Sequence, residues 1–318
     1  MNQQNPRLTL RLFLRQTYGP RKLLAASAIE QIEFAINSLE KWAARIVYLD
    51  ELSNDLICAW MAFRLGKCER STVKRERQAI RSLWLFALSP SMRAKCPALE
   101  LPELPTIQTP KKAPRAMRPD ALEAILFEAG RLRSFLPLEE STIRWSHWAI
   151  ALLATMYETG ARITALLNVA PADVSFQSRT IRLSWMHAKK MHEQVLPLSD
   201  QSLRAIRKIW SAERDQVWPW PYTKREIWRW LKRLAKRAGV PLENYQAFHS
   251  VRKTTATVMT ACSDIGRASQ QLGHSSIEMT LSRYVDPQLL NELRGPAVHV
   301  MPALRMAEAG CDRQLMLW

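Results

Sequence analysis

The sequence predicts a mainly α-helical protein with one small three-stranded β-sheet, divided into two domains. Glycine is scarce, with 9 in 318 residues, while tryptophan and methionine number 12 each, which favours helices over glycine-rich turns. Apolar residues recur at helical spacing over much of the chain, and only three short runs have the β-branched or aromatic character of strands. Six prolines between residues 97 and 119 interrupt the helical pattern and indicate a linker.

Positive charge is distributed over the whole chain. The net charge is +17 at pH 7, and residues 1–115 alone hold 19 Lys and Arg against 10 Asp and Glu. A basic surface that extends over both halves favours a polyanionic partner such as nucleic acid. A plain cationic surface without such a partner is the alternative.

The cysteines and the apolar runs indicate the cellular compartment of the protein. The cysteines lack CxxC spacing and a histidine at ligand spacing, which predicts reduced thiols in an intracellular protein and no metal site. They are Cys58, Cys68, Cys96, Cys262 and Cys311. The N-terminus does not resemble a signal peptide, and no run of about 18 apolar residues is present to span a membrane. We therefore expect a cytoplasmic protein, associated with the nucleoid if DNA is its partner.

Residues 1–97 predict a helical domain. The first 29 residues carry five basic residues and no acid, which fits either a disordered arm or a first helix near DNA. Helices are expected over 27–44, 52–65 and 71–88. The last of these has an apolar stripe and, on another face, three cations: Lys74, Arg77 and Arg81. Such a helix can bury one side and offer the cations to a phosphate backbone, with a solvated charged face as the alternative.

A proline-rich linker is expected at 98–116 and a second domain at 117–318. Lys111 and Lys112 in the linker are close enough to the domains to touch DNA. In the second domain, residues 145–157 predict a buried helix that ends at Gly160, and Arg162 follows directly. An arginine beside such an apolar run is costly to bury unpaired, so we expect a fixed anionic partner. A structural salt bridge is the alternative interpretation.

The three β runs cover 173–176, 180–185 and 194–198 and predict a small sheet. Lys189 and Lys190 lie between the second and third runs, where an ammonium group on a hairpin can reach a leaving oxygen or a phosphate. A helix over 222–238 carries seven Lys and Arg and one acid. Its basic face either lines DNA or is solvated.

The stretch from His249 to Tyr284 holds the densest set of reactive side chains. His249 and Arg252 are three residues apart, so they project from one face of a helix. Gly273 and His274 follow at a helix junction, and Tyr284 comes ten residues after His274. Cationic and hydrogen-bond-donating groups near one phenol suit chemistry on a phosphodiester, because arginine binds phosphate oxygens and histidine donates or accepts a proton.

The order H-x-x-R, L-G-H-S-S and tyrosine, preceded by E-T-G-A-R and a hairpin lysine, resembles the tyrosine recombinase (phage integrase) family. The resemblance is strong from about residue 145 to 286 and loose before that. It implies a helical core-binding domain followed by a catalytic domain of the tyrosine recombinase type. It also implies six catalytic residues: Arg162, Lys189, His249, Arg252, His274 and Tyr284.

In the chemistry that the resemblance implies, Tyr284 attacks a DNA phosphodiester and forms a 3′-phosphotyrosyl intermediate. Lys189 falls on the family's hairpin lysine, while Lys190 replaces a common glycine and is expected to contact DNA. Neither a cofactor nor a metal is required, and the partners are double-stranded DNA with specific sites and a tetramer of protomers on that DNA. One departure is Ala165, because the family usually has an acid at this position.

Two other functions remain open from the sequence. A type IB-like topoisomerase uses the same kind of site, but the helical N-terminal module favours recombination. A non-catalytic architectural or regulatory DNA-binding protein on the same fold is favoured by Ala165 and opposed by the full set of six catalytic residues.

Overall fold

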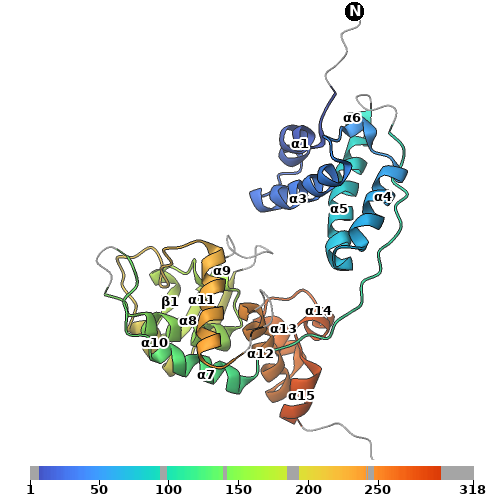
Figure 1. The fold of residues 1–318 in the computed structure, drawn as a ribbon. Coiled ribbons are helices and arrows are strands. Elements are labelled where there is room, and N and C mark those ends of the chain that lie inside the picture. The colour runs from blue at the N-terminus through green and yellow to red at the C-terminus, as the bar shows by residue number, and fades with distance from the viewer. Residues whose placement is uncertain are drawn as a thin grey trace, which may run out of the picture. The chain divides into compact units, whose positions relative to one another are not determined.

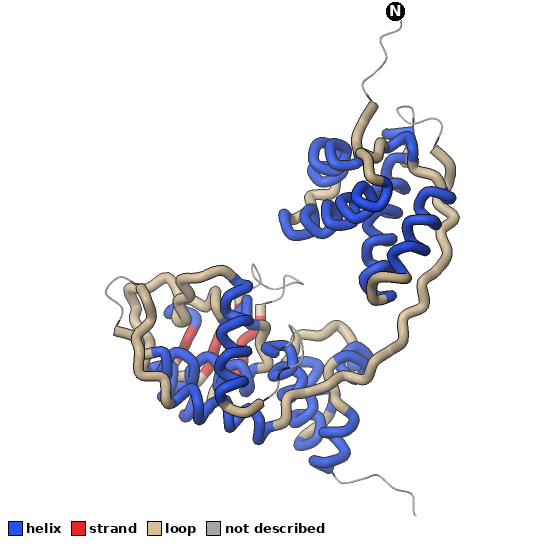
Figure 2. Tube along the Cα trace, in the orientation of Figure 1, coloured by secondary structure: helices blue, strands red, loops and turns tan. Residues whose placement is uncertain are grey.

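The computed structural model describes residues 7–93, 99–138, 142–184, 193–240, 242 and 247–294. The chain divides into two compact units, residues 1–111 and 112–318 (Figure 1). Helices make up most of both units, and one three-stranded antiparallel sheet lies in the second (Figure 2). The predicted fold class is therefore confirmed. None of the helices in the described part is both long and apolar enough to cross a membrane.

The first unit is built around three long helices. Its helices are α1 (Leu10–Phe13), a π-helical turn (Leu14–Tyr18), α2 (Gly19–Arg21), α3 (Ala26–Ala43), a 3₁₀ turn (Leu49–Glu51), α4 (Asn54–Leu65), α5 (Arg70–Ala87) and α6 (Pro90–Arg93). Ser53 begins α4 by accepting a hydrogen bond from Leu56 N, as a helix cap does. The basic N-terminal stretch thus forms helix in its described part rather than an extended arm.

Helix α5 packs its apolar stripe into the core of the first unit. Ile80, Leu83 and Trp84 are fully buried there, together with Trp60 of α4. An ion pair of 2.6 Å between Arg64 and Glu76 joins α4 to α5 beside this core. The amphipathic pattern of the sequence therefore sets the packing of this helix, because its buried residues recur every three or four positions.

Residues 99–107, inside the predicted linker, pack against the first unit. Leu99, Leu104 and Ile107 are buried in its hydrophobic core. The side chain of Asn54 donates to Leu101 O at 3.1 Å and accepts from Glu103 N at 2.8 Å. No helix or strand forms over 99–118, as the prolines predict, but the first half of this stretch belongs structurally to the first unit.

The second unit surrounds a small sheet with helices. Its elements are α7 (Pro119–Gly130), α8 (Trp145–Thr159), α9 (Ile163–Leu166), a 3₁₀ turn (Pro171–Asp173), β1 (Val174–Ser175), β2 (Thr180–Leu183), β3 (Gln194–Pro197), α10 (Asp200–Arg207), α11 (Lys224–Arg237), α12 (Ala247–Cys262), α13 (Ile265–Gln271), α14 (Ile277–Arg283) and α15 (Pro287–Arg294). Strand β2 pairs antiparallel with both neighbours, with Ile181 opposite Val174 on one side and Leu196 on the other. The sheet order is β1-β2-β3, so the predicted three-stranded sheet is present.

Helices α8 and α12 form the centre of the second unit. Trp148, Leu152 and Met156 of α8 are buried, as its almost continuous apolar sequence predicts. Helix α12 contacts α8, α11, α13 and α15. A row of buried threonines on α12 bonds to neighbouring segments, including Thr255, whose hydroxyl donates to Tyr157 O at 2.7 Å. These contacts hold α12 in one position relative to the end of α8.

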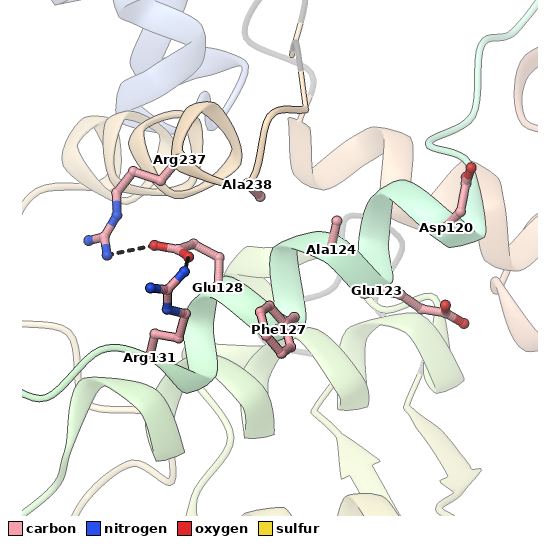
Figure 3. Close-up of a pocket in the computed structure, with 8 residues that line it drawn as sticks. All are labelled: Asp120, Glu123, Ala124, Phe127, Glu128, Arg131, Arg237 and Ala238. Atoms are coloured by element: carbon pink, nitrogen blue, oxygen red, sulfur yellow. Dashed lines mark hydrogen bonds and ion pairs between the residues drawn. The ribbon is translucent and has the colours of Figure 1, made fainter.

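Helix α11 is held against α7 by a carboxylate. Glu128, which is 7% exposed, pairs with Arg237 at 2.6 Å and with Arg131 at 3.4 Å (Figure 3). Phe127 projects beside them and is 74% exposed. The pocket that these residues line contains none of the predicted catalytic residues.

The exposed part of the predicted linker should be the site where proteases cut first. Residues 99–107 are packed on the first unit, and Ala116 N donates to Asp286 in the second at 2.7 Å. Between them lie three exposed trypsin sites: Lys111, Lys112 and Arg115. We expect limited trypsin digestion without DNA to cut at these residues and to release two stable fragments, read by mass spectrometry. A resistant fragment that spans residues 100–130 would contradict the division.

Candidate active site

The structure brings five of the six predicted catalytic residues together. His249 and Arg252 lie on α12, Arg162 is the N-cap of α9, His274 follows α13, and Tyr284 is the C-cap of α14. The sixth, Lys189, and the neighbouring Lys190 lie outside the described residues. The five described residues come from segments more than 120 positions apart, so the site exists only in the folded unit.

Arg252 is the most deeply buried member of the site, with 2% of its side chain exposed. Its Nη1 donates to Gly160 O at 2.5 Å, and its Nη2 donates to Leu272 O at 2.6 Å. Its Nε is buried without a hydrogen-bond partner in the described part of the chain. Burial lowers the pKa of Arg252, the nearby Arg162 lowers it further, and Tyr284 opposes both effects. A buried cation with a spare donor is suited to hold an anion.

His274 is fixed on both sides of its ring. Its Nε2 lies 3.1 Å from Arg252 Nη2, and its Nδ1 lies 2.8 Å from the hydroxyl of Thr280 on α14. Gly273 supplies the turn before it, with a φ of +62° that side-chain-bearing residues rarely adopt. The amide of Gln194, on β3, fills the space where a side chain at residue 273 would project. The tight turn therefore requires glycine.

Tyr284 lies against both histidines and the buried arginine. Its ring centroid is 4.2 Å from that of His274 and 5.0 Å from that of His249. The guanidinium carbon of Arg252 lies 5.4 Å from the centre of the phenol ring. The tyrosine residue is 9% exposed. These contacts fix the phenol among the groups that the sequence predicts to assist it.

His249 is neutral over the physiological range. The pKa of its imidazole falls from 6.5 to about 4, first because of burial and then because of the positive charges of Lys253, Arg252 and Arg162. A neutral imidazole has a nitrogen lone pair that can accept a proton. The phenol of Tyr284, whose ring meets that of His249 edge-on, has a proton to give.

Arg162 has no hydrogen bond or ion pair from its side chain to any residue that the structure describes. The structural salt bridge that is the alternative interpretation of Arg162 is therefore absent from the described part. Its charge nevertheless lowers the pKa values of His249 and Arg252, which places the guanidinium beside both. Ala165, one helical turn away, packs its methyl group against the hydrophobic core. An unpaired arginine next to a buried one leaves a positive site ready for an anion.

The site is thus a cluster of cations and donors around one phenol. No group of His, Cys, Asp and Glu capable of holding a metal occurs in the residues that the structure describes. Two arginines and one histidine converge where a phosphate oxygen can be held, and the neutral His249 contacts the attacking group. This arrangement supports nucleophilic attack by a tyrosine on a phosphodiester.

Comparisons with known proteins agree with this chemistry. The model of the phage integrase family matches residues 137–289. The chain is 24% identical over 275 residues to tyrosine recombinase XerD of Vibrio cholerae, covering 81% of the chain and 85% of XerD. It is 28% identical over 142 residues to tyrosine recombinase XerC of Corynebacterium glutamicum, covering 41% of the chain and 44% of XerC.

Solved structures show the same fold. A XerH site-specific recombinase bound to a palindromic difH substrate has a TM-score of 0.65 at 14% identity, over 89% of the chain and 83% of XerH. A lambda integrase dimer bound to a COC′ core site has a TM-score of 0.62 at 13% identity, over 93% of the chain and 80% of the integrase. Residues 137–289 match the phage integrase family, and the relatives support a member of the tyrosine recombinases.

Sequence reasoning overlooked the groups that position the recombinase's site. The Gly160 and Leu272 carbonyls hold Arg252, and Thr280 holds His274. Gln194 donates to Gln271 O at 3.1 Å and so joins β3 to the turn before His274. Gly160 is recognisable as a helix cap in the sequence, but backbone acceptors and a lone threonine give no sequence signal of such a role.

The predicted DNA-binding cations of the first unit differ in their surroundings. Lys74 is exposed and Arg81 is half-buried. Arg77 is half-buried and donates to Leu104 O at 2.7 Å, and burial lowers its pKa. Arg77 thus helps to fasten residues 99–107 to the first unit of the recombinase. In the predicted linker, Lys111 at the end of the first unit and Lys112 at the start of the second are both exposed.

Alanine substitutions at Gly160 and Gly239, which both have left-handed backbone, measure how the tight packing beside Arg252 contributes to stability. A Cβ at Gly160 (φ +62°) would lie 2.5 Å from Leu272 Cδ2 and 3.3 Å from Thr255 Cγ2, whereas a Cβ at Gly239 (φ +71°) would meet nothing within 4 Å. Both alanine variants incur a backbone cost of roughly 1–2 kcal/mol. Gly160→Ala adds overpacking, so we expect its free energy of unfolding to fall by about 3 kcal/mol or more.

Urea unfolding of the two variants, followed by tryptophan fluorescence, measures this difference. Gly239→Ala serves as the matched control for the backbone conformation. Equal losses of stability in the two variants would show that the contact between Gly160 and Leu272 is not close.

Proposed function

We propose that this recombinase cuts and rejoins double-stranded DNA at specific sites through a covalent bond to Tyr284. The phenol oxygen attacks the phosphorus atom, a bond forms between them, and the bond from phosphorus to the 5′-oxygen breaks. The products are a 3′-phosphotyrosyl linkage and a free 5′-hydroxyl. Because the linkage keeps the energy of the phosphodiester, a 5′-hydroxyl of another strand can reverse the step without a cofactor.

The observation that carries this proposal is the buried Arg252 beside Tyr284, with its Nε unpaired. We assign Arg162 and Arg252 to the non-bridging phosphate oxygens, where their charges stabilise the transition state. His274 supplies a further donor from the position held by Thr280. A buried guanidinium without a carboxylate partner and with an unused donor costs stability, and a bound phosphate offsets that cost.

His249 is assigned to the proton of Tyr284. The ordinary pKa of a phenol is about 10, so a neutral tyrosine is a poor nucleophile unless a base removes its proton. The lowered pKa of His249 keeps the imidazole unprotonated and able to accept. The bound phosphate adds negative charge that stabilises the imidazolium after the transfer.

The remaining assignments rest on the resemblance to the family. Lys189 is assigned to protonate the departing 5′-oxygen, and Lys190 to contact the DNA backbone. The first unit would bind the DNA backbone through exposed cations such as Lys74 and Lys111, and Lys112 at the start of the second unit would add a further contact. A tetramer on paired sites would bring four copies of Tyr284 to the strands that exchange. The protein would then act in the cytoplasm, associated with the nucleoid.

Trapping of the covalent intermediate tests the role of Tyr284. With a nicked suicide substrate that carries the recombination site, the wild type should form an adduct that survives denaturant. Tyr284→Phe removes one oxygen, so it should bind the same DNA with similar affinity and form no adduct. Arg162→Ala and Arg252→Ala should each slow cleavage by about a hundredfold or more, because each removes charge stabilisation of the transition state.

Peptide mapping of the adduct identifies the attached residue. A nucleotide on any residue other than Tyr284 would disprove the assignment, and so would an adduct formed by Tyr284→Phe. The fold of each variant is checked by circular dichroism, which matters most for Arg252→Ala because Arg252 bonds to two carbonyls.

The cations of α5 test whether the first unit touches DNA. Replacement of Lys74 and Arg81 by alanine should weaken DNA binding, and each lost phosphate contact should lower the salt slope by about one. Stability should not change, since neither side chain forms a hydrogen bond or ion pair with a residue that the structure describes. Arg77→Ala is the comparison, because loss of its bond to Leu104 should lower stability. An unchanged affinity and salt slope for the double variant would assign this face to solvent.

A further inference from the structure

A buried lysine lies between the catalytic base and the segment that follows the nucleophile. His249, Lys253 and Thr257 are four residues apart on α12, so their side chains form one stripe. At one end of the stripe, the ring of His249 contacts the ring of Tyr284. At the other end, Thr257 accepts a hydrogen bond from Asp286 N at 2.9 Å. Lys253 therefore lies against the backbone that connects Tyr284 to Asp286.

Lys253 lacks the partners that a buried lysine ordinarily has. Only 9% of the residue is exposed, and no described residue forms a hydrogen bond or ion pair with its ammonium group. The carboxylate of Asp286 attracts it but already accepts bonds from Ala116 N, Gln288 N and Leu289 N. A buried ammonium without a close counter-ion costs stability, and an apolar side chain would fill the same space without that cost.

We propose that Lys253 is a positioning residue for DNA cleavage: its ammonium group, fixed behind His249 by the stripe on α12, keeps that imidazole neutral so that it can take the proton of Tyr284. This inference rests on the proposed role of His249 as the base. Lys253 contacts neither Tyr284 nor the phosphate in this assignment. It acts through the histidine one helical turn before it.

The charges around His249 show why Lys253 matters. The groups that face the imidazole are Lys253 and Arg252 from its own helix, Arg162 from the start of α9, and the phenol of Tyr284 after α14. Burial is the largest cause of the lowered pKa of His249, and among the three cations Lys253 lowers it more than either arginine does. Arg162 and Arg252 are assigned to the phosphate, whose negative charge offsets them when DNA binds. Lys253 lies behind the histidine, so its effect should persist in the complex.

The direction of the effect on pH dependence follows from these charges. A histidine with a lowered pKa is neutral at pH 5 and above, and it gains a proton only near pH 4. Loss of a neighbouring positive charge favours the imidazolium form and raises the pKa. The acid side of the cleavage profile should therefore move to higher pH when Lys253 is made neutral.

Nuclear magnetic resonance of the DNA-free full chain measures the proposal directly. The imidazole signal of His249, identified by its loss in His249→Gln, is followed from pH 4 to 8 in four proteins. They are the wild type, Lys253→Met, Lys253→Arg and, as a control for net charge, Lys41→Met on the exposed face of α3. We expect the pKa of His249 to rise by roughly one pH unit in Lys253→Met. It should stay near its wild-type value in Lys253→Arg and Lys41→Met.

The rate of cleavage of the suicide substrate should show the same pattern. Its fall at acid pH should begin at a higher pH in Lys253→Met than in the wild type, Lys253→Arg or Lys41→Met. A pKa of His249 that is unchanged in Lys253→Met would overturn the proposal. Should Lys253→Met fail to fold, the wild type still decides, because an ordinary His249 pKa near 6.5 contradicts the proposal. Restored cleavage by Lys253→Met on DNA with a 5′-bridging sulfur would instead make Lys253 the donor to the leaving group. If the wild type forms no covalent adduct with DNA, the proposed recombinase chemistry is wrong. The His249 pKa is measured without DNA, so it tests the effect of Lys253 independently of that result.

Discussion

The geometry of the site depends on the buried guanidinium of Arg252. It bonds to the carbonyl of Gly160, the residue that ends α8, and to the carbonyl of Leu272, the residue that ends α13. Carbonyl groups at the end of a helix have no partner within it, and the helix dipole makes this end negative. Arg252 thus satisfies two acceptors that would otherwise be buried without a donor, and they in turn stabilise its charge away from water.

This arrangement also places the other phosphate-binding groups. Arg162 lies two residues after Gly160, and His274 lies two residues after Leu272. Each carbonyl that Arg252 holds therefore fixes the start of a segment that delivers another donor to the site. Glycine residues make both turns possible, since Gly160 and Gly273 adopt left-handed backbone that other residues adopt only with strain. Both turns belong to the same hydrogen-bonded unit as Arg252.

The electrostatic balance of the site follows from its partners. Arg252 is held by neutral carbonyls, Arg162 has no carboxylate among the described residues, and Ala165 stands where relatives usually have an acid. The cluster therefore carries uncompensated positive charge, which favours a bound phosphate and keeps His249 neutral. Because no described carboxylate pairs with either arginine, a bound phosphate would supply the negative charge that the two arginines need.

The sequence alone determined the fold class and the three strands, and it predicted the five residues that the structure brings together in one site. It could do so because helical and alternating apolar patterns are local, and because H-x-x-R, L-G-H and the final tyrosine occur in a recognisable order. Only the tertiary structure decided that Arg77 bonds to Leu104, that residues 99–107 pack on the first unit, and that Asp286 N bonds to Thr257 on α12. These features depend on backbone carbonyls and on burial between segments distant in the chain, which leave no periodic signal in the sequence.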